Sequence, residues 1–330
     1  MYAEDPSRKF LPSIGFLKKY QEPKAHEHIR IDTGVQEGSE ISMYYDPMIS
    51  KLITWGKDRE TAMTLMDNAI DEYVVQGVAH NLGFGQSIIA NESFWKGDYS
   101  TAFIPEFYPD GFKGERLQDS DMQTLALACH KMKNISSSQY KEAAERDNIH
   151  NKTVYVTIVG KGEDSDRDWK VSQLSADQFE ITCMETNKST KVNMSGFNFE
   201  HNSLIEMTVG SDDFVVQYVG QQHDLKYDFY FCGGNVNTMI YDETQYKYKK
   251  HMAPPVKLDH SKSVLSPMPG AIVAVNVEVG QTVVDGQDLA IVEAMKMQNI
   301  LKSERDGVIK SIKVKAGDSV AVDELLIEFE

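Results

Sequence analysis

The middle of the chain alternates between apolar and polar residues, which is the pattern of strands with one buried face. Gly, Asn and Asp separate six such runs between residues 153 and 231: VYVTIVG, WKVSQL, QFEITCM, LIEMTVG, DFVVQYVG and LKYDFYF. A helix is expected before them, because one face at helical spacing carries Met122, Leu125, Ala126 and Cys129. We therefore expect residues 115–250 to form a helix plus an antiparallel β-barrel.

Residues 1–114 show a mixed pattern of short strands and helices. Asp58 is a suitable N-cap for a helix whose apolar positions recur at spacings of three and four, at Met63, Met66, Ile70 and Tyr73. Gly77 is a suitable residue to end that region, and a second helix is expected over Ala79–Asn91. This part therefore predicts an α+β arrangement rather than a barrel.

Residues 264–330 contain an internal repeat with an offset of 37 residues. The repeat aligns Gly270 with Gly307, Ile272 with Ile309, Gly280 with Gly317, Val283 with Val320 and Leu289 with Leu326. Neither half could bury its apolar face alone. We therefore expect a flattened all-β domain in which the two halves pack with an internal twofold relation. Residues 251–263, which include Pro254-Pro255, are expected to form an exposed linker.

Length, charge and cysteine content limit the kinds of partner and compartment that this chain is expected to have. A chain of 330 residues suggests about two domains, with three possible. The net charge of −16 argues against nucleic acid or an anionic membrane surface as the main partner, and no apolar run is long enough to cross a membrane. Three cysteines without a CxxC pair fit a reducing compartment. His26 and His28 lack further ligands at metal spacing, so no metal site is expected.

The residues between the two half-repeats are the strongest candidate for chemistry. They read Ala294-Met295-Lys296-Met297, and a connection between symmetric halves belongs on the surface. Lys296 is therefore expected at the tip of a tight hairpin. There an enzyme can modify its flexible side chain, which can then carry a tethered group. The alternative is an ordinary surface lysine between two methionines that only pack.

This segment resembles the biotin carrier domain of biotin-dependent carboxylases. The resemblance rests on AMKM, on SPMPG at 266–270 and on RDG at 305–307. It implies that Lys296 carries covalent biotin, attached by a biotin protein ligase, and that Met295 and Met297 are the flanking motif. The methionines distinguish the segment from the related lipoyl domain, which is the third hypothesis for its function.

The N-terminal part resembles the C-terminal end of the biotin carboxylase component. AEDPSRKFLPSIG and YYDPMISKLITWG carry this resemblance. It implies that residues 1–114 are an incomplete piece of an ATP-grasp domain, and that the residues for ATP, bicarbonate and Mg would lie upstream in the complete enzyme. Asp46, in the YYDPM turn, would orient another active-site group, and the alternative is a turn-forming Asp before Pro. No catalytic residue is certain in this chain.

The order of the parts resembles the alpha subunits of mitochondrial acyl-CoA carboxylases. EAMKMQN, FLPSIGFLKKYQEP and YPDGFKG are most similar to the branch that acts on propionyl-CoA, and the methylcrotonyl-CoA branch is the alternative. The resemblance implies a multidomain α+β chain in a hetero-oligomer, a middle region that docks a carboxyltransferase beta subunit, and a mitochondrial matrix location. A second hypothesis is a stand-alone biotin carrier and docking module, whereas the partial carboxylase domain favours a truncated chain.

Overall fold

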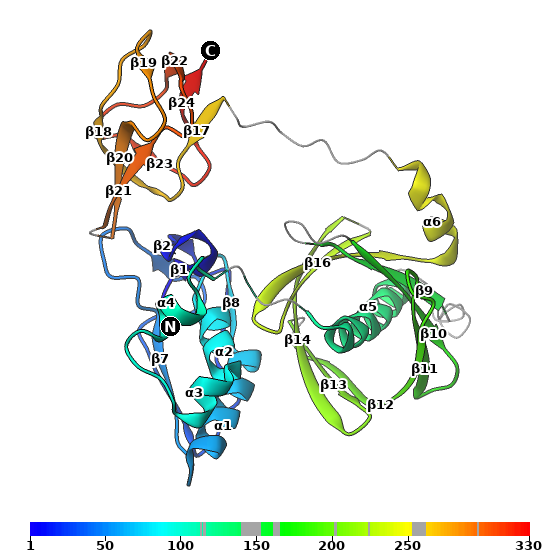
Figure 1. Ribbon diagram of the computed structural model, residues 1–330. Helices are drawn as coiled ribbons and strands as arrows, with labels where there is room; N and C mark the ends of the chain where they lie inside the picture. The colour runs from blue at the N-terminus through cyan, green and yellow to red at the C-terminus, as the bar shows by residue number, and fades with distance from the viewer. Residues whose placement is uncertain are drawn as a thin grey trace.

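Three structural parts follow one another along the chain (Figure 1). The computed structural model describes residues 1–112, 114, 117–139, 153–160, 166–200, 203–223, 225–252, 262–295 and 297–330. We call residues 1–112 the N-terminal part, α5 with β9–β16 the barrel, and residues 262–330 the repeat domain. Most of the expected linker 251–263, including Pro254-Pro255, lies outside the described residues.

The N-terminal part combines four short antiparallel ribbons with four helices. The ribbons are β1 (Glu4–Asp5) with β2 (Leu11–Pro12), β3 (Gly15–Phe16) with β6 (Glu40–Ile41), β4 (Lys19–Gln21) with β8 (Val74–Gln76), and β5 (Ile29–Thr33) with β7 (Ser50–Thr54). The helices are α1 (Arg59–Glu72), α2 (Leu82–Ala90), α3 (Glu92–Lys96) and α4 (Phe103–Phe107). As expected, Asp58 caps α1, where its carboxylate accepts a hydrogen bond from the Thr61 backbone N–H at 2.8 Å.

The barrel is closed by eight antiparallel strands in the order β10-β11-β12-β13-β14-β15-β16-β9. Their bounds are β9 Thr153–Ile158, β10 Arg167–Gln173, β11 Gln178–Cys183, β12 Ser189–Glu200, β13 Leu204–Val209, β14 Asp212–His223, β15 Lys226–Phe231 and β16 Gly234–Tyr241. The six expected runs are six of these strands, and β12 and β16 complete the circle. A short helix, α6 (Glu243–Tyr248), follows β16 and contacts it.

Strand β12 was missed because a β-bulge interrupts its alternation. The pairing with β13 shifts register between Met194 and Gly196, so that one extra residue is inserted. Buried or partly buried apolar positions therefore change from even numbers, at Val192 and Met194, to odd numbers, at Phe197 and Phe199. A search for strict alternation does not recognise a strand whose apolar positions change from even to odd residue numbers in the middle.

Helix α5 (Asp119–Gln139) lies within the ring of strands in Figure 1 and packs against strands around the ring, among them β9, β10, β13 and β16. The five consecutive residues 125–129 are each 0% exposed, so every side of this stretch is covered. The sequence had indicated one apolar face. The buried small side chains of Ala126 and Ala128 explain the difference, because they let the helix fit inside the barrel.

The repeat domain consists of two four-stranded sheets. One has the order β17-β24-β22-β19 and the other the order β21-β20-β18-β23. The strands are β17 Ser263–Leu265, β18 Gly270–Val275, β19 Thr282–Val283, β20 Asp288–Ala294, β21 Met297–Lys302, β22 Gly307–Ile312, β23 Ser319–Val320 and β24 Leu325–Phe329. Adding 37 to the first residue of β18, β19 or β20 gives the first residue of β22, β23 or β24, so the sequence repeat is also the structural repeat.

The aligned apolar positions of the two halves form one common core. Ile272 and Ile309, and Leu289 and Leu326, are buried together. Each half thus supplies the cover that the other lacks, as the sequence indicated.

The N-terminal part and the barrel meet through a close backbone contact. Cys232 and Gly233, both at positive φ, form the two-residue turn between β15 and β16. A Cβ atom built on Gly83 of α2 would lie only 1.9 Å from the Gly233 carbonyl oxygen. The side chain of Gln217 in β14 adds hydrogen bonds to the backbone carbonyl oxygens of Asp71, at 3.0 Å, and Tyr73, at 3.1 Å. The barrel therefore packs directly against α1 and α2.

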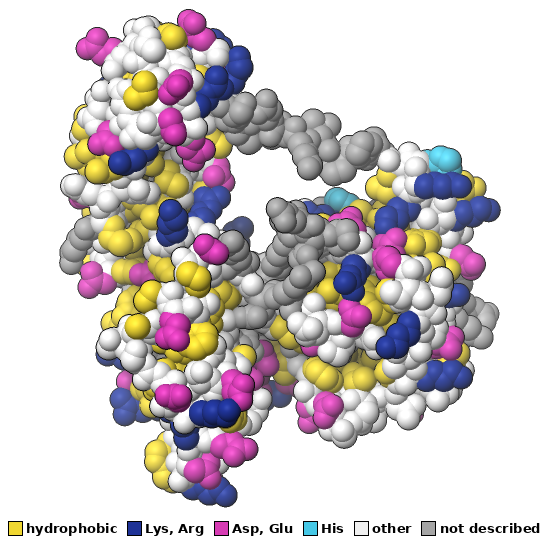
Figure 2. All heavy atoms as spheres, in the orientation of Figure 1, with side chains coloured by type: hydrophobic (Ala, Val, Ile, Leu, Met, Phe, Trp, Pro, Cys, Tyr) yellow, Lys and Arg dark blue, Asp and Glu magenta, His cyan; other side chains and the backbone are white. Residues whose placement is uncertain are grey.

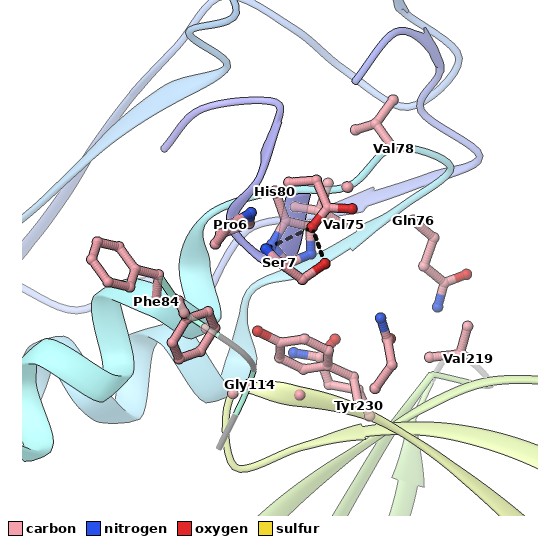
Figure 3. A pocket seen from close by; sticks show the side chains of 18 of the residues that line it. Pro6, Ser7, Val75, Gln76, Val78, His80, Phe84, Gly114, Val219 and Tyr230 are labelled. Carbon is pink, nitrogen blue, oxygen red and sulfur yellow. Dashed lines mark hydrogen bonds between the residues drawn. The ribbon is translucent and has the colours of Figure 1, made fainter. Parts of the chain in front are cut away.

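A cavity of about 420 Å³ with a mixed polar and apolar lining lies at this junction (Figure 3). Pro6, His80 and Phe84 line it from the N-terminal part, and Val219 and Tyr230 line it from the barrel. Two buried polar atoms of residues that line the cavity, His80 Nδ1 and the Tyr230 hydroxyl, have no hydrogen-bond partner in the described part of the chain. Burial lowers the pKa of His80 to about 4, so this ring is neutral at pH 7.

The first prediction concerns the glycine at the junction. Gly83→Ala should lower the free energy of unfolding of the N-terminal part by about 1–3 kcal/mol, because the new methyl group overlaps backbone of the barrel. Gly85→Ala in the same helix is the matched control. Its Cβ meets no atom within 4 Å, so it should raise stability by about 0.5–1 kcal/mol. Denaturant unfolding of both variants measures the difference, and equal effects would contradict the close contact.

The second prediction concerns Asp71 in α1. Burial raises its pKa to about 7, although a 2.8 Å hydrogen bond from the Gln86 amide partly opposes the shift. Since the folded-state pKa exceeds the unfolded one, the protonated group contributes stability that is lost as the pH rises toward 7. Asp71→Asn removes this loss. Its stability relative to the native chain should therefore increase by about 2 kcal/mol between pH 5.5 and pH 8.

Thermal unfolding of the native chain and the Asp71→Asn variant at both pH values provides the measurement. Asp98→Asn, which changes an exposed aspartate of the same part, serves as the control and should show no such growth. An Asp71→Asn effect that stays constant with pH would show that this carboxyl group does not titrate in the neutral range.

Candidate functional site

The candidate site is the hairpin that joins the two halves of the repeat domain. Ala294, at the end of β20, pairs with Met297, at the start of β21, so only two residues form the turn. Met295 has a φ of 48°, a left-handed conformation that lets the chain reverse direction within two residues. Lys296 itself lies outside the described residues. The structure therefore defines the two flanks of the expected modified lysine.

The base of this hairpin is firmly held in its sheet. The Gln298 amide donates a 2.6 Å hydrogen bond to the Glu293 carboxylate directly opposite, which links the two strands near the turn. Val292 and Ala294 on β20 are buried in the core of the repeat domain. A group attached at the turn would therefore move with the domain as a whole.

The two methionines of the AMKM motif have different environments. Met295 is 5% exposed and belongs to the buried cluster of the N-terminal part rather than to the core of its own domain. Its backbone N–H donates a 2.8 Å hydrogen bond to the carbonyl oxygen of Met43. Met297 is 40% exposed. One flank of the turn thus contacts the N-terminal part, while the other flank remains accessible.

The loop that receives the hairpin contains Asp46. Residues 42–49 connect β6 to β7, and their Met43 makes the contact with Met295. The Asp46 side chain is exposed in this loop. The structure therefore brings together two of the segments that the sequence singled out, AMKM and YYDPM. That Asp46 orients another active-site group stays a prediction.

A second contact joins the same two parts. The guanidinium group of Arg8 donates hydrogen bonds to the Pro267 carbonyl oxygen at 3.1 Å and to both carboxylate oxygens of Asp323 at 3.2 Å. Leu11 packs against the core of the repeat domain. Pro267 lies in the SPMPG segment, but nothing in the sequence pattern indicated Arg8, Met43 or Asp323. Contacts between parts distant in the chain leave no periodic signal.

Other kinds of site lack support in the described part of the chain. No group of three or more His, Cys, Asp and Glu side chains there is arranged to hold a metal ion. His26 and His28 lie ring against ring at 5.5 Å, and His28 also contacts Trp55. No described helix has both the length and the apolar character of a membrane span. Acidic and basic side chains are interspersed over the face shown in Figure 2.

Three protein-family models match successive stretches of the chain. Residues 1–106 match the biotin carboxylase C-terminal domain, residues 123–257 the propionyl-coenzyme A carboxylase BT domain, and residues 262–329 the biotin-requiring enzyme domain. The three matches follow the order of the three structural parts. They agree with the expected fold class of a multidomain α+β chain.

Similar proteins are found along the full length of the chain. It is 37% identical to the mitochondrial propionyl-CoA carboxylase alpha chain of Mus musculus, and the match covers 100% of this chain and 45% of that one. It is 36% identical to the propionyl-CoA carboxylase alpha chain of Ruegeria pomeroyi, covering 100% of this chain and 50% of that one. The mitochondrial methylcrotonoyl-CoA carboxylase subunit alpha of Dictyostelium discoideum is 28% identical, over 97% of this chain and 46% of that one. The chain spans about half the length of these relatives.

The third prediction concerns the support behind the hairpin. A Cβ atom on Gly270 would lie 2.5 Å from the Glu293 carbonyl oxygen, whereas the nearest neighbour of a Cβ atom on Gly307, its counterpart in the repeat, would be the Phe329 ring, at 3.1 Å. Gly270→Ala should therefore destabilise the repeat domain by about 1–3 kcal/mol, and Gly307→Ala by less, because a side chain yields more easily than backbone. Thermal unfolding of the two variants tests this, and the reverse order would contradict it.

Proposed function

We propose that this chain is the biotin carrier and subunit-docking portion of an acyl-CoA carboxylase. It matches the family models of the biotin carboxylase C-terminal, BT and biotin-requiring enzyme domains, and it is similar along its whole length to propionyl-CoA carboxylase alpha chains. The observation that supports this most strongly is the placement of AMKM on a two-residue turn between two symmetric halves. Lys296 is the residue that receives biotin, and Met295 and Met297 are its flanking motif.

The attachment requires a biotin protein ligase as a partner. The uncharged Lys296 amine attacks the activated carboxyl group of biotin, an amide bond forms, and the activating group leaves. When bound, biotin supplies a ureido nitrogen that accepts and releases a carboxyl group. The protein residues supply position: the paired strands β20 and β21 hold the turn, and the exposed Met297 leaves one side of it open.

The carrier function depends on movement between two sites. ATP, bicarbonate and Mg would be used at the biotin carboxylase site of the complete enzyme, and the carboxyl group would be transferred at a carboxyltransferase beta subunit. Residues 251–263 act as the tether, which keeps the effective concentration of the carrier high at both sites. The carrier domain contributes proximity of the biotin to each site rather than acid or base catalysis.

The barrel is the proposed docking part for the beta subunit, within a hetero-oligomer. The BT-domain match supports this assignment. Propionyl-CoA, converted to methylmalonyl-CoA, is the proposed acyl substrate, since the identity to propionyl-CoA carboxylase alpha chains, 37%, exceeds that to the methylcrotonoyl-CoA subunit, 28%. The mitochondrial matrix is the proposed location, because the mouse and human relatives are mitochondrial, although the Ruegeria pomeroyi relative is bacterial.

The fourth prediction tests the attachment site. After incubation of the full chain with a biotin protein ligase, ATP and biotin, intact-mass analysis should show one added biotinyl group, and peptide sequencing should place it in AMKMQN. Lys296→Arg should abolish the addition, since a guanidinium group is far too weakly nucleophilic at neutral pH. Lys302→Arg, on β21 of the same hairpin, should be labelled as the native chain is. Biotin on the Lys296→Arg variant would contradict the assignment.

A further inference from the structure

Two separated contacts hold the repeat domain on the N-terminal part. At one, Arg8 reaches the backbone of Pro267 and the carboxylate of Asp323. At the other, the Met43 carbonyl oxygen accepts the hydrogen bond from Met295. Leu11 adds an apolar contact to the core of the repeat domain. We call Arg8, Leu11 and Met43 the seat.

The backbone of the seat is unusual. Lys9 and Phe10 are consecutive residues with φ values of 57° and 60°, a conformation that costs free energy for residues other than glycine. They lie between Arg8 and Leu11, the two seat residues of this segment. The ring of Phe10 packs edge-on against that of Phe84 at 5.0 Å, which anchors the strained segment to α2. Strain of this kind commonly marks a recognition surface.

The contact between the repeat domain and the N-terminal part is weak enough to be reversible. The Arg8 and Asp323 side chains are 40% and 60% exposed, so water screens their attraction and the ion pair is weak. Beside the Met43 contact, the Met295 side chain is buried in the cluster of the N-terminal part, whereas Met297 is left exposed. A bound state of this form can exchange with a released one.

We propose that the seat is an intramolecular docking site for the hairpin turn and that a biotin protein ligase acts on the released repeat domain. While Met295 is buried against the N-terminal part, the ligase cannot surround the turn and read both flanks of the lysine. The rate of modification is then set by the fraction of molecules in which the domain has left the seat. The second half of this proposal rests on the proposed function, and the first half does not.

The fifth prediction is that weakening the seat accelerates biotinylation. Arg8→Gln in the full chain should increase the initial rate of ligase labelling by roughly two- to fivefold, the range expected for loss of an exposed ion pair. Asp323→Asn should act similarly, and asparagine tolerates the positive φ of 60° at this position. The double variant should be no faster than the faster single one, because both changes remove the same contact.

Arg30→Gln is the matched control. It also removes an arginine of the N-terminal part and breaks an exposed ion pair, with Asp32, but that pair makes no contact with the repeat domain. Its labelling rate should equal that of the native chain. If Arg8→Gln and Arg30→Gln are labelled at the same rate, the proposed link between the seat and modification is wrong.

Amide hydrogen exchange separates the seat from the carrier function. The Met295 amide should be protected in the native chain and in Arg30→Gln, and should exchange two- to fivefold faster in Arg8→Gln. If protection follows this order but Lys296 is never labelled, the seat stands and the carrier function fails. If Lys296 is labelled but its neighbouring amide exchanges as in an unfolded peptide in every variant, the carrier function stands and the seat is wrong.

Discussion

Mutual burial of two half-repeats is the constraint on which the functional end of this chain depends. Each half of the repeat domain has one apolar face and nothing of its own to cover it. Once the halves pack on each other, the connection between them must run on the surface and turn sharply, because β20 and β21 are paired up to Ala294 and Met297. The position of the AMKM turn is thus a consequence of core packing.

The barrel solves a similar problem in a different way. Its eight strands surround α5, and the apolar side chains of the helix and of the strands form one buried core. The barrel in turn rests on the N-terminal part through the Gly83–Gly233 contact and the hydrogen bonds of Gln217. Backbone-to-backbone contact of this kind fixes the orientation of one part on another more strictly than contacts between flexible side chains, because backbone cannot change rotamer.

The sequence predicts those features that follow a regular period or a local rule. The offset of 37 residues, six of the barrel strands and the Asp58 cap all follow local rules, and the structure contains them. Strand β12 escaped detection because a bulge changes its parity, and the full enclosure of α5 because alanine on a helix does not reveal whether it faces a strand or water. The seat could not be found at all, since Arg8 and its partner Asp323 are 315 residues apart and lie in two separate parts of the chain.

Closure of the barrel also limits how another protein can bind there. Every one of its strands has a hydrogen-bonded neighbour on both sides, and only the overhanging ends of the long strands β12 and β14, among the described strands, are paired on one side alone. An added strand can therefore pair only with these overhanging ends, and anything that binds elsewhere on the barrel must recognise its side chains, through shape and charge. Recognition of that kind depends on particular residues rather than on backbone, so that substitutions on the barrel surface can change which molecule binds there without changing the fold.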